Sequence, residues 1–145
     1  MSAESTHIAA IQAHLLRSPF HRLFSPEVIA VDHETLSLTV KAYQCAELER
    51  QPGTDQWHGG AIAALVDTVG CYALTLLGAE PLPTINFRTD YLRPAIRTDL
   101  FATAVVRQAG RSVGVVDVDI NNSNDKLIAL GRASYSMTAF NKAPG

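Results

Sequence analysis

The stretch GGAIAALVDTVGCYALTLL, residues 59–77, decides the fold of this chain. At a rise of about 1.5 Å per residue, a helix of this length extends about 28 Å. Its apolar side chains lie nearly all round the helix, so the helix must be surrounded by protein. Asp67 and four glycines, counted through Gly78, interrupt the run. We therefore expect a buried central helix rather than a membrane span.

Alternating apolar and polar residues predict strands on both sides of this helix. The expected strands cover residues 28–31, 36–42, 85–91, 100–106, 116–120 and 127–137. Apolar residues at helical spacing predict an N-terminal helix over about residues 4–17, and Pro19 and Pro26 bracket a loop. The order of these elements is a helix, two strands, a buried helix and then four strands. This order predicts one α+β domain over residues 1–145, with an antiparallel sheet of five or six strands around one helix.

Charge and sheet edges restrict the partners of this domain. The net charge is −2, which argues against a nucleic-acid binder. Residues 1–80 carry a net −5 and residues 81–145 a net +3, so an anionic ligand is expected on the later segments. A single sheet leaves open edges that invite pairing, so we expect a homo-oligomer built through the sheet.

The two cysteines, Cys45 and Cys71, form neither a disulfide framework nor a metal cluster, and they fit a reducing compartment. The N-terminus shows no signal-peptide pattern. We therefore expect a cytoplasmic protein without a bound metal and without membrane attachment.

The string WHGGAIAALVDTVG, residues 57–70, concentrates the candidate chemistry. The first N–H groups of a helix lack internal partners and lie at the positive end of the helix dipole, so Gly59 and Gly60 form an open site for a developing negative oxygen. Asp67 is costly among apolar neighbours unless it has partners, and it suits a general base. It could equally face a water-filled groove, and His58 could simply cap the helix.

Other catalytic classes have little support in the sequence. Cys71 is expected to be a small core residue rather than a nucleophile. Ser112 and Ser134 lack a nucleophile-elbow context, and the chain contains no phosphate-binding GxxxxGK[ST] or GxGxxG pattern.

Two strings resemble a known family: HGGAIAALVDTVG at 58–70 and PTINFRTDYLRPA at 83–95. Together they resemble the hotdog-fold acyl-CoA thioesterases, in particular the PaaI-like branch. The resemblance extends over about residues 28–137, and it implies a curved antiparallel sheet wrapped around the central helix. It also implies a homodimer or a dimer of dimers, that is, a homotetramer.

The resemblance also implies roles for individual residues. Asp67 matches the catalytic carboxylate, and His58 and Gly59 match the turn whose amide binds the thioester oxygen. Thr84 matches a hydroxyl residue that the partner subunit contributes and that orients water.

Further positions are matched for substrate binding. Arg93 and the turn with Arg111 and Ser112 match regions that contact CoA. Relatives carry an Asn or Gln before HGG, and here Arg50, Gln51 or Gln56 could take its place, with Gln51 preferred.

The implied activity is hydrolysis of an acyl-CoA thioester to free acid and CoA, without a cofactor. The amides of Gly59 and Gly60 would polarise the carbonyl, and Asp67 of the opposite protomer would activate water or attack directly. The alternative is a hotdog domain that binds acyl-CoA or another small ligand without converting it. A hotdog dehydratase ranks last, because it expects a different pairing of histidine and acid.

Overall fold

The structure is a computed structural model, and it describes residues 1–141. Four α-helices, two short 3-10 helices and six strands make up this part of the chain. The helical elements are α1 (Ala3–Leu15), α2 (Pro19–Arg22), η1 (Ala46–Leu48), α3 (Gly59–Ala73), η2 (Leu74–Leu77) and α4 (Thr138–Asn141). The strands are β1 (Glu27–Asp32), β2 (Ser37–Ala42), β3 (Thr84–Tyr91), β4 (Leu100–Ala109), β5 (Val113–Asn122) and β6 (Leu127–Ser136).

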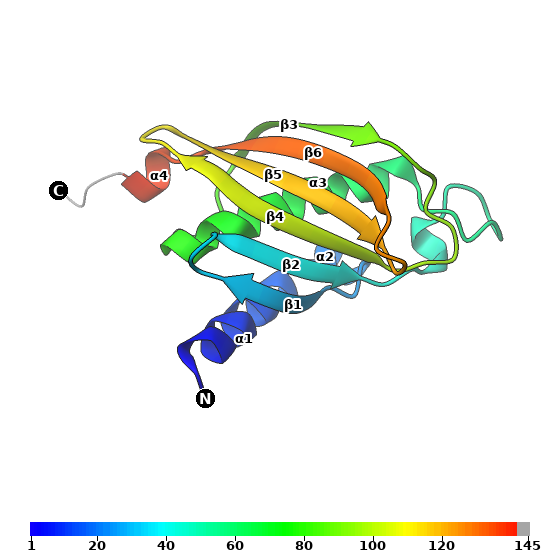
Figure 1. The fold of residues 1–145 in the computed structure, drawn as a ribbon, viewed down its shortest axis with the longest axis horizontal. Coiled ribbons are helices and arrows are strands. Elements are labelled where there is room, and N and C mark those ends of the chain that lie inside the picture. Colours follow the sequence, from blue (N-terminus) through cyan, green and yellow to red (C-terminus); the bar gives the residue numbers. More distant parts are fainter. Residues whose placement is uncertain (142–145) are drawn as a thin grey trace.

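All six strands form one antiparallel sheet in the order β1-β2-β4-β5-β6-β3. The sheet curves around α3, while α1 lies beside β1 (Figure 1). Buried residues alternate with more exposed ones along β2, β4 and β5, so one face of the sheet packs on the helix. The expected α+β architecture, with six strands and one central helix, is confirmed.

The central helix packs closely enough on the sheet to require glycine at the contact. A Cβ atom at Gly131 of β6 would lie 2.6 Å from the carbonyl oxygen of Arg88 and 2.6 Å from Cγ1 of Val66 on α3. By length and composition Gly59–Leu77 could span a membrane, but more than half of its apolar window is buried inside the fold. The expectation of a buried core helix is therefore confirmed.

The segment between Pro19 and Pro26 differs from the expected loop. Residues 19–22 form α2, because Ser18 caps the helix by accepting a hydrogen bond from the His21 amide at 3.4 Å. Pro19 occupies the first position of the helix, where the missing N–H has no helical partner to lose.

One edge of the sheet is open. β3 pairs only with β6, and nearly all of its residues are exposed. Large apolar side chains are exposed along this strand and directly after it: Ile85 is 57% exposed and Tyr91 52%, and Leu92, the residue after β3, is 53% exposed. A strand edge with apolar side chains and unpaired backbone groups is a surface that favours pairing with another chain.

Candidate active site

The N-terminus of α3 presents one free amide rather than two. The Gly60 amide donates a hydrogen bond to Nδ1 of His58 at 2.8 Å, so His58 is the N-cap of the helix. A Cβ at Gly60 would lie 2.9 Å from this nitrogen, and glycine therefore leaves room for the cap. Within residues 1–141 the Gly59 amide has no hydrogen-bond partner. The expectation of two free amides is therefore wrong for Gly60, whose N–H is taken by the cap, and the role of the free Gly59 amide toward a substrate stays a prediction.

A pocket of about 520 Å³ lies at this helix end. Its lining residues come from the loop before α3, from the start of α3, and from the end of β3 with the segment that follows it: Arg50, Gln56, Trp57, Gly59, Gly60, Ile62, Tyr91, Leu92, Arg93, Pro94 and Ala95. Two of them, Arg50 and Arg93, carry positive charge, and this lining contains no acidic residue of the described chain. The pocket therefore favours an anionic ligand.

Tyr91 supports the first turn of α3, a role that the sequence analysis did not assign. Its hydroxyl donates to the carbonyl oxygen of Gly59 at 2.5 Å. Its ring lies 3.5 Å from the position that a Cβ on Gly59 would take. Tyr91 stands at the end of β3, in a strand pattern that also suits a core residue, so no local pattern signalled this contact.

The loop before the helix places a different glutamine in the pocket from the one preferred. Gln51 is exposed in a turn outside the pocket, and its carbonyl accepts hydrogen bonds from the amide and hydroxyl of Thr54. Gln56 lines the pocket, because its carbonyl accepts from the Arg50 amide at 2.8 Å and it pairs with Ile96. The structure therefore favours Gln56 and Arg50 over Gln51.

The candidate acid has two hydrogen-bonded supports on the sheet. The hydroxyl of Thr84 donates to Oδ1 of Asp67 at 2.6 Å. The hydroxyl of Tyr135 donates to the backbone carbonyl of Asp67 at 2.5 Å, and a Cβ at Gly70 would lie 2.5 Å from that hydroxyl oxygen. Asp67 and Thr84 thus form one unit within a single protomer.

The free amide and the acid lie too far apart to act on one atom within one chain. Asp67 follows Gly59 by eight residues, which is about 12 Å along the helix. The turn between β4 and β5, which contains Arg111 and Ser112, lies beside α4 at the opposite end of the sheet from the loop before α3 (Figure 1). Arg93 lies near Gly59 and donates from Nη1 to the Leu127 carbonyl at 3.1 Å. Within one chain, the free Gly59 amide and the candidate acid therefore lie at separate places along α3.

Cys71 is expected to be unreactive at neutral pH. Burial raises the pKa of its thiol to about 11, and the nearby Asp67 carboxylate adds to this shift. The thiol donates to the Leu82 carbonyl at 3.4 Å. The thiolate fraction should thus stay small at pH 7 and grow only as the pH approaches 11. The rate of iodoacetamide labelling of Cys71, followed by peptide mass spectrometry across this pH range, measures the thiolate fraction.

The control for this labelling is the protein unfolded in guanidinium chloride, in which thiols titrate near their ordinary pKa of about 8.5. Complete and rapid labelling of Cys71 in the folded protein at pH 7 would contradict the expected burial.

The structure offers little for metal binding. Among the described residues, no group of three or more His, Cys, Asp or Glu side chains lies close enough to hold a metal ion.

A six-stranded antiparallel sheet curved around one central helix is the hotdog fold. The model of the thioesterase superfamily matches residues 56–129, which contain α3, β3, β4, β5 and the start of β6. The chain belongs to the thioesterase superfamily.

Individual relatives agree with this assignment. Acyl-coenzyme A thioesterase PaaI of Escherichia coli is 38% identical over 81 residues, which make up 55% of this chain and 57% of PaaI. Medium/long-chain acyl-CoA thioesterase YigI of Escherichia coli is 32% identical over 93 residues, 54% of this chain and 60% of YigI. The chain thus spans about three fifths of the length of these curated relatives.

Solved structures extend the likeness over nearly the whole chain. The structure of Escherichia coli PaaI, from the phenylacetic acid degradation operon, has a TM-score of 0.74 at 28% identity and covers 90% of this chain and 94% of that one. Another structure from the thioesterase superfamily has a TM-score of 0.84 at 30% identity, with 90% and 98% covered. The resemblance to PaaI-like proteins is therefore confirmed.

Proposed function

We propose that this protein hydrolyses an acyl-CoA thioester to the free acid and CoA. The observation that carries this proposal is the unpaired Gly59 amide, which lies at the positive end of the central helix in a pocket with two arginines. A developing oxyanion and the phosphates of CoA are the two anions that such a pocket suits. The names of the relatives PaaI and YigI support the same substrate class.

We further propose that two protomers share each active site. Gly59 and Asp67 of one chain are separated by about 12 Å along the helix, so the carboxylate that acts beside Gly59 would come from a second protomer. The open edge of β3 offers the surface for it, since Thr84 begins this strand and binds Asp67. Pairing across this edge would bring the partner's Asp67 toward Gly59 and bury the exposed apolar side chains. The expected assembly is a homodimer or a dimer of dimers.

In this mechanism the Gly59 amide donates to the thioester oxygen as negative charge develops on it. The partner's Asp67 either removes a proton from the attacking water, or attacks the carbonyl carbon itself to form a mixed anhydride that water then hydrolyses to the free acid. In both routes the C–S bond breaks and CoA leaves as the thiolate, and the proton released from water passes to that thiolate or to solvent. Thr84 holds Oδ1 of the carboxylate, which leaves Oδ2 for the reaction. Arg50 and Arg93, with the partner's Arg111 and the partner's Ser112, are the groups that we propose for CoA.

A thiol-release assay over aliphatic and aromatic acyl-CoA esters tests the proposal. We expect release of free CoA for at least one class of ester, at a rate that increases linearly with enzyme concentration. Tight binding of acyl-CoA without release at any chain length would instead establish the domain as a binding module. Buffer with heat-denatured protein is the control for spontaneous hydrolysis.

A further inference from the structure

Two residues adjacent to the pocket-lining segments adopt a backbone conformation that side-chain-bearing residues rarely take. Asp55 has φ 55° and Arg97 has φ 49°, both in the left-handed region. They lie in separate segments, one before α3 and one between β3 and β4. Rare conformations of this kind persist only where the surrounding contacts enforce them.

These two residues bind each other directly. The Arg97 amide donates to the Asp55 carbonyl at 3.0 Å, and Nε of Arg97 lies 3.2 Å from Oδ2 of Asp55. Nε2 of Gln44 donates to the same carbonyl at 2.9 Å. We call Gln44, Asp55 and Arg97 the Asp55 clamp.

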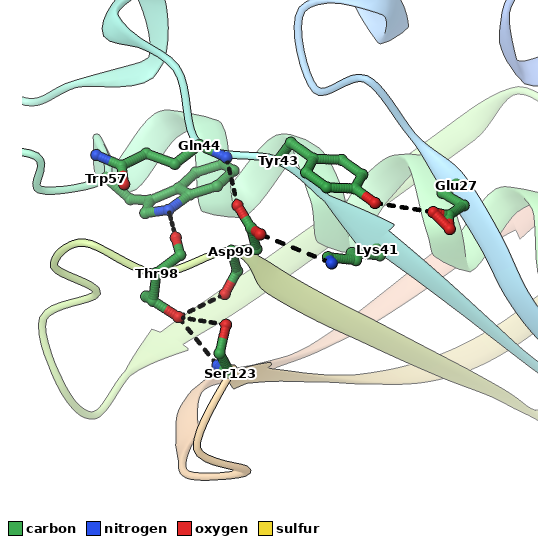
Figure 2. A network of polar contacts seen from close by, with 8 residues as sticks. All are labelled: Glu27, Lys41, Tyr43, Gln44, Trp57, Thr98, Asp99 and Ser123. Atoms are coloured by element: carbon green, nitrogen blue, oxygen red, sulfur yellow. Dashed lines mark hydrogen bonds and ion pairs between the residues drawn. The ribbon is translucent and has the colours of Figure 1, made fainter.

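The clamp is anchored to the sheet. The backbone amide of Gln44 donates to Oδ1 of Asp99 at 3.0 Å. Nζ of Lys41 on β2 lies 3.7 Å from Oδ2 of the same carboxylate (Figure 2). The hydroxyl of Thr98 binds Ser123 in the turn between β5 and β6 (Figure 2). Both segments of the clamp are thus fixed to the same end of the sheet.

The residues directly after Asp55 form a wall of the pocket. Gln56 pairs with Ile96, and the Trp57 amide donates to the Ala95 carbonyl at 2.9 Å. Nε1 of Trp57 donates to the Thr98 carbonyl at 2.8 Å (Figure 2). His58 and Gly59 follow immediately, so the position of this wall also sets the position of the helix start.

We propose that Asp55 is a positioning residue, which through Gln44 and Arg97 holds the Gln56–Trp57 wall and the start of α3 in place for the substrate. This proposal rests on the proposed function, because the substrate of the pocket is acyl-CoA. Asp55 does not line the pocket, and it acts only through its neighbours. Its loss should weaken substrate binding more than the chemical step.

The test replaces Asp55 by alanine. We expect KM for the best acyl-CoA to rise about fivefold with kcat within about twofold of the wild type, since alanine keeps the backbone carbonyl of Asp55 but loses the side-chain contacts to Arg97 and Gln44, and the acid is untouched. Trp57 is the single tryptophan and is 2% exposed, so its fluorescence reports the position of the wall in the absence of substrate. Acrylamide quenching of its fluorescence should increase severalfold in D55A, with a red-shifted emission.

Asp125→Ala is the matched control, because Asp125 also has a positive φ of 60° and accepts a hydrogen bond from Asn121, but lies outside the pocket. It should leave KM and Trp57 quenching unchanged. Asparagine tolerates the left-handed backbone and keeps one acceptor oxygen. Asp55→Asn should therefore bring both KM and Trp57 quenching back most of the way to the wild-type values. If D55A does not fold, Arg97→Ala removes the ion pair and serves as the second variant.

Wild-type KM and wild-type Trp57 quenching in folded D55A would overturn the proposal, and so would equal changes in D125A. Failure of the proposed function is distinguishable from this result: the wild type would then release no thiol, while Trp57 quenching in D55A would still decide whether the clamp holds the wall.

Discussion

Asp67→Asn is expected to lower kcat for acyl-CoA hydrolysis by roughly 10²–10⁴-fold, the usual contribution of a general base. An amide can neither accept the proton of water at neutral pH nor attack the carbonyl. Its oxygen can still accept the hydrogen bond from Thr84, so the fold should be retained. The measurement is the initial rate of thiol release at saturating substrate, together with the melting temperature of the variant.

Asp119→Asn is the matched control for this prediction. Asp119 lies exposed on β5, between buried residues that point to the core, and it should tolerate the same change with unchanged kcat. A D67N variant with near-wild-type turnover would exclude Asp67 from the chemical step and with it the proposed mechanism.

Gly59→Pro removes the free amide without removing the helix, and kcat should fall by roughly 10²–10³-fold, the cost of one oxyanion donor. Proline is favoured at the first helical position, where its missing N–H is not needed by the helix. His58 already has an extended backbone, with φ −66° and ψ 134°, as the residue before a proline requires. The readout is again kcat, with circular dichroism to confirm the helix.

Gly59→Ala separates loss of the amide from addition of side-chain atoms. An alanine Cβ would meet the Tyr91 ring at 3.5 Å, an ordinary contact distance, and the N–H remains. Activity close to that of the wild type is therefore expected for G59A. Equal losses in G59A and G59P would mean that steric fit at Tyr91, and not the amide donor, limits turnover.

Mixing the two inactive variants tests whether the site is shared. Co-expressed D67N and G59P chains that pair at random should recover about a quarter of the wild-type activity, because each mixed dimer then holds one intact site and one doubly altered site. If each site lay within a single chain, every site would carry a lesion and the mixture would stay inactive.

The sequence by itself determined the N-terminal helix, the central helix, the six strands and their order, while the short helix α2 was missed. The apolar run from residue 59 to 77 can be stable only inside protein, and the alternating segments after it have one apolar face each, so a sheet around one helix follows from local patterns. The same local logic identified the helix start at Gly59 and the isolated carboxylate of Asp67. These features depend on neighbours within one or two turns, which the sequence displays directly.

Tertiary structure decided which of these candidates meet. Three contacts depend on side-chain geometry and on strand register. His58 accepts the hydrogen bond of the Gly60 amide, Gln56 rather than Gln51 lines the pocket, and Thr84 binds Asp67. The Asp55 clamp joins segments about forty residues apart, and no local pattern announces it. Contacts between distant segments are fixed by how the whole chain packs, and for that reason only the folded structure shows them.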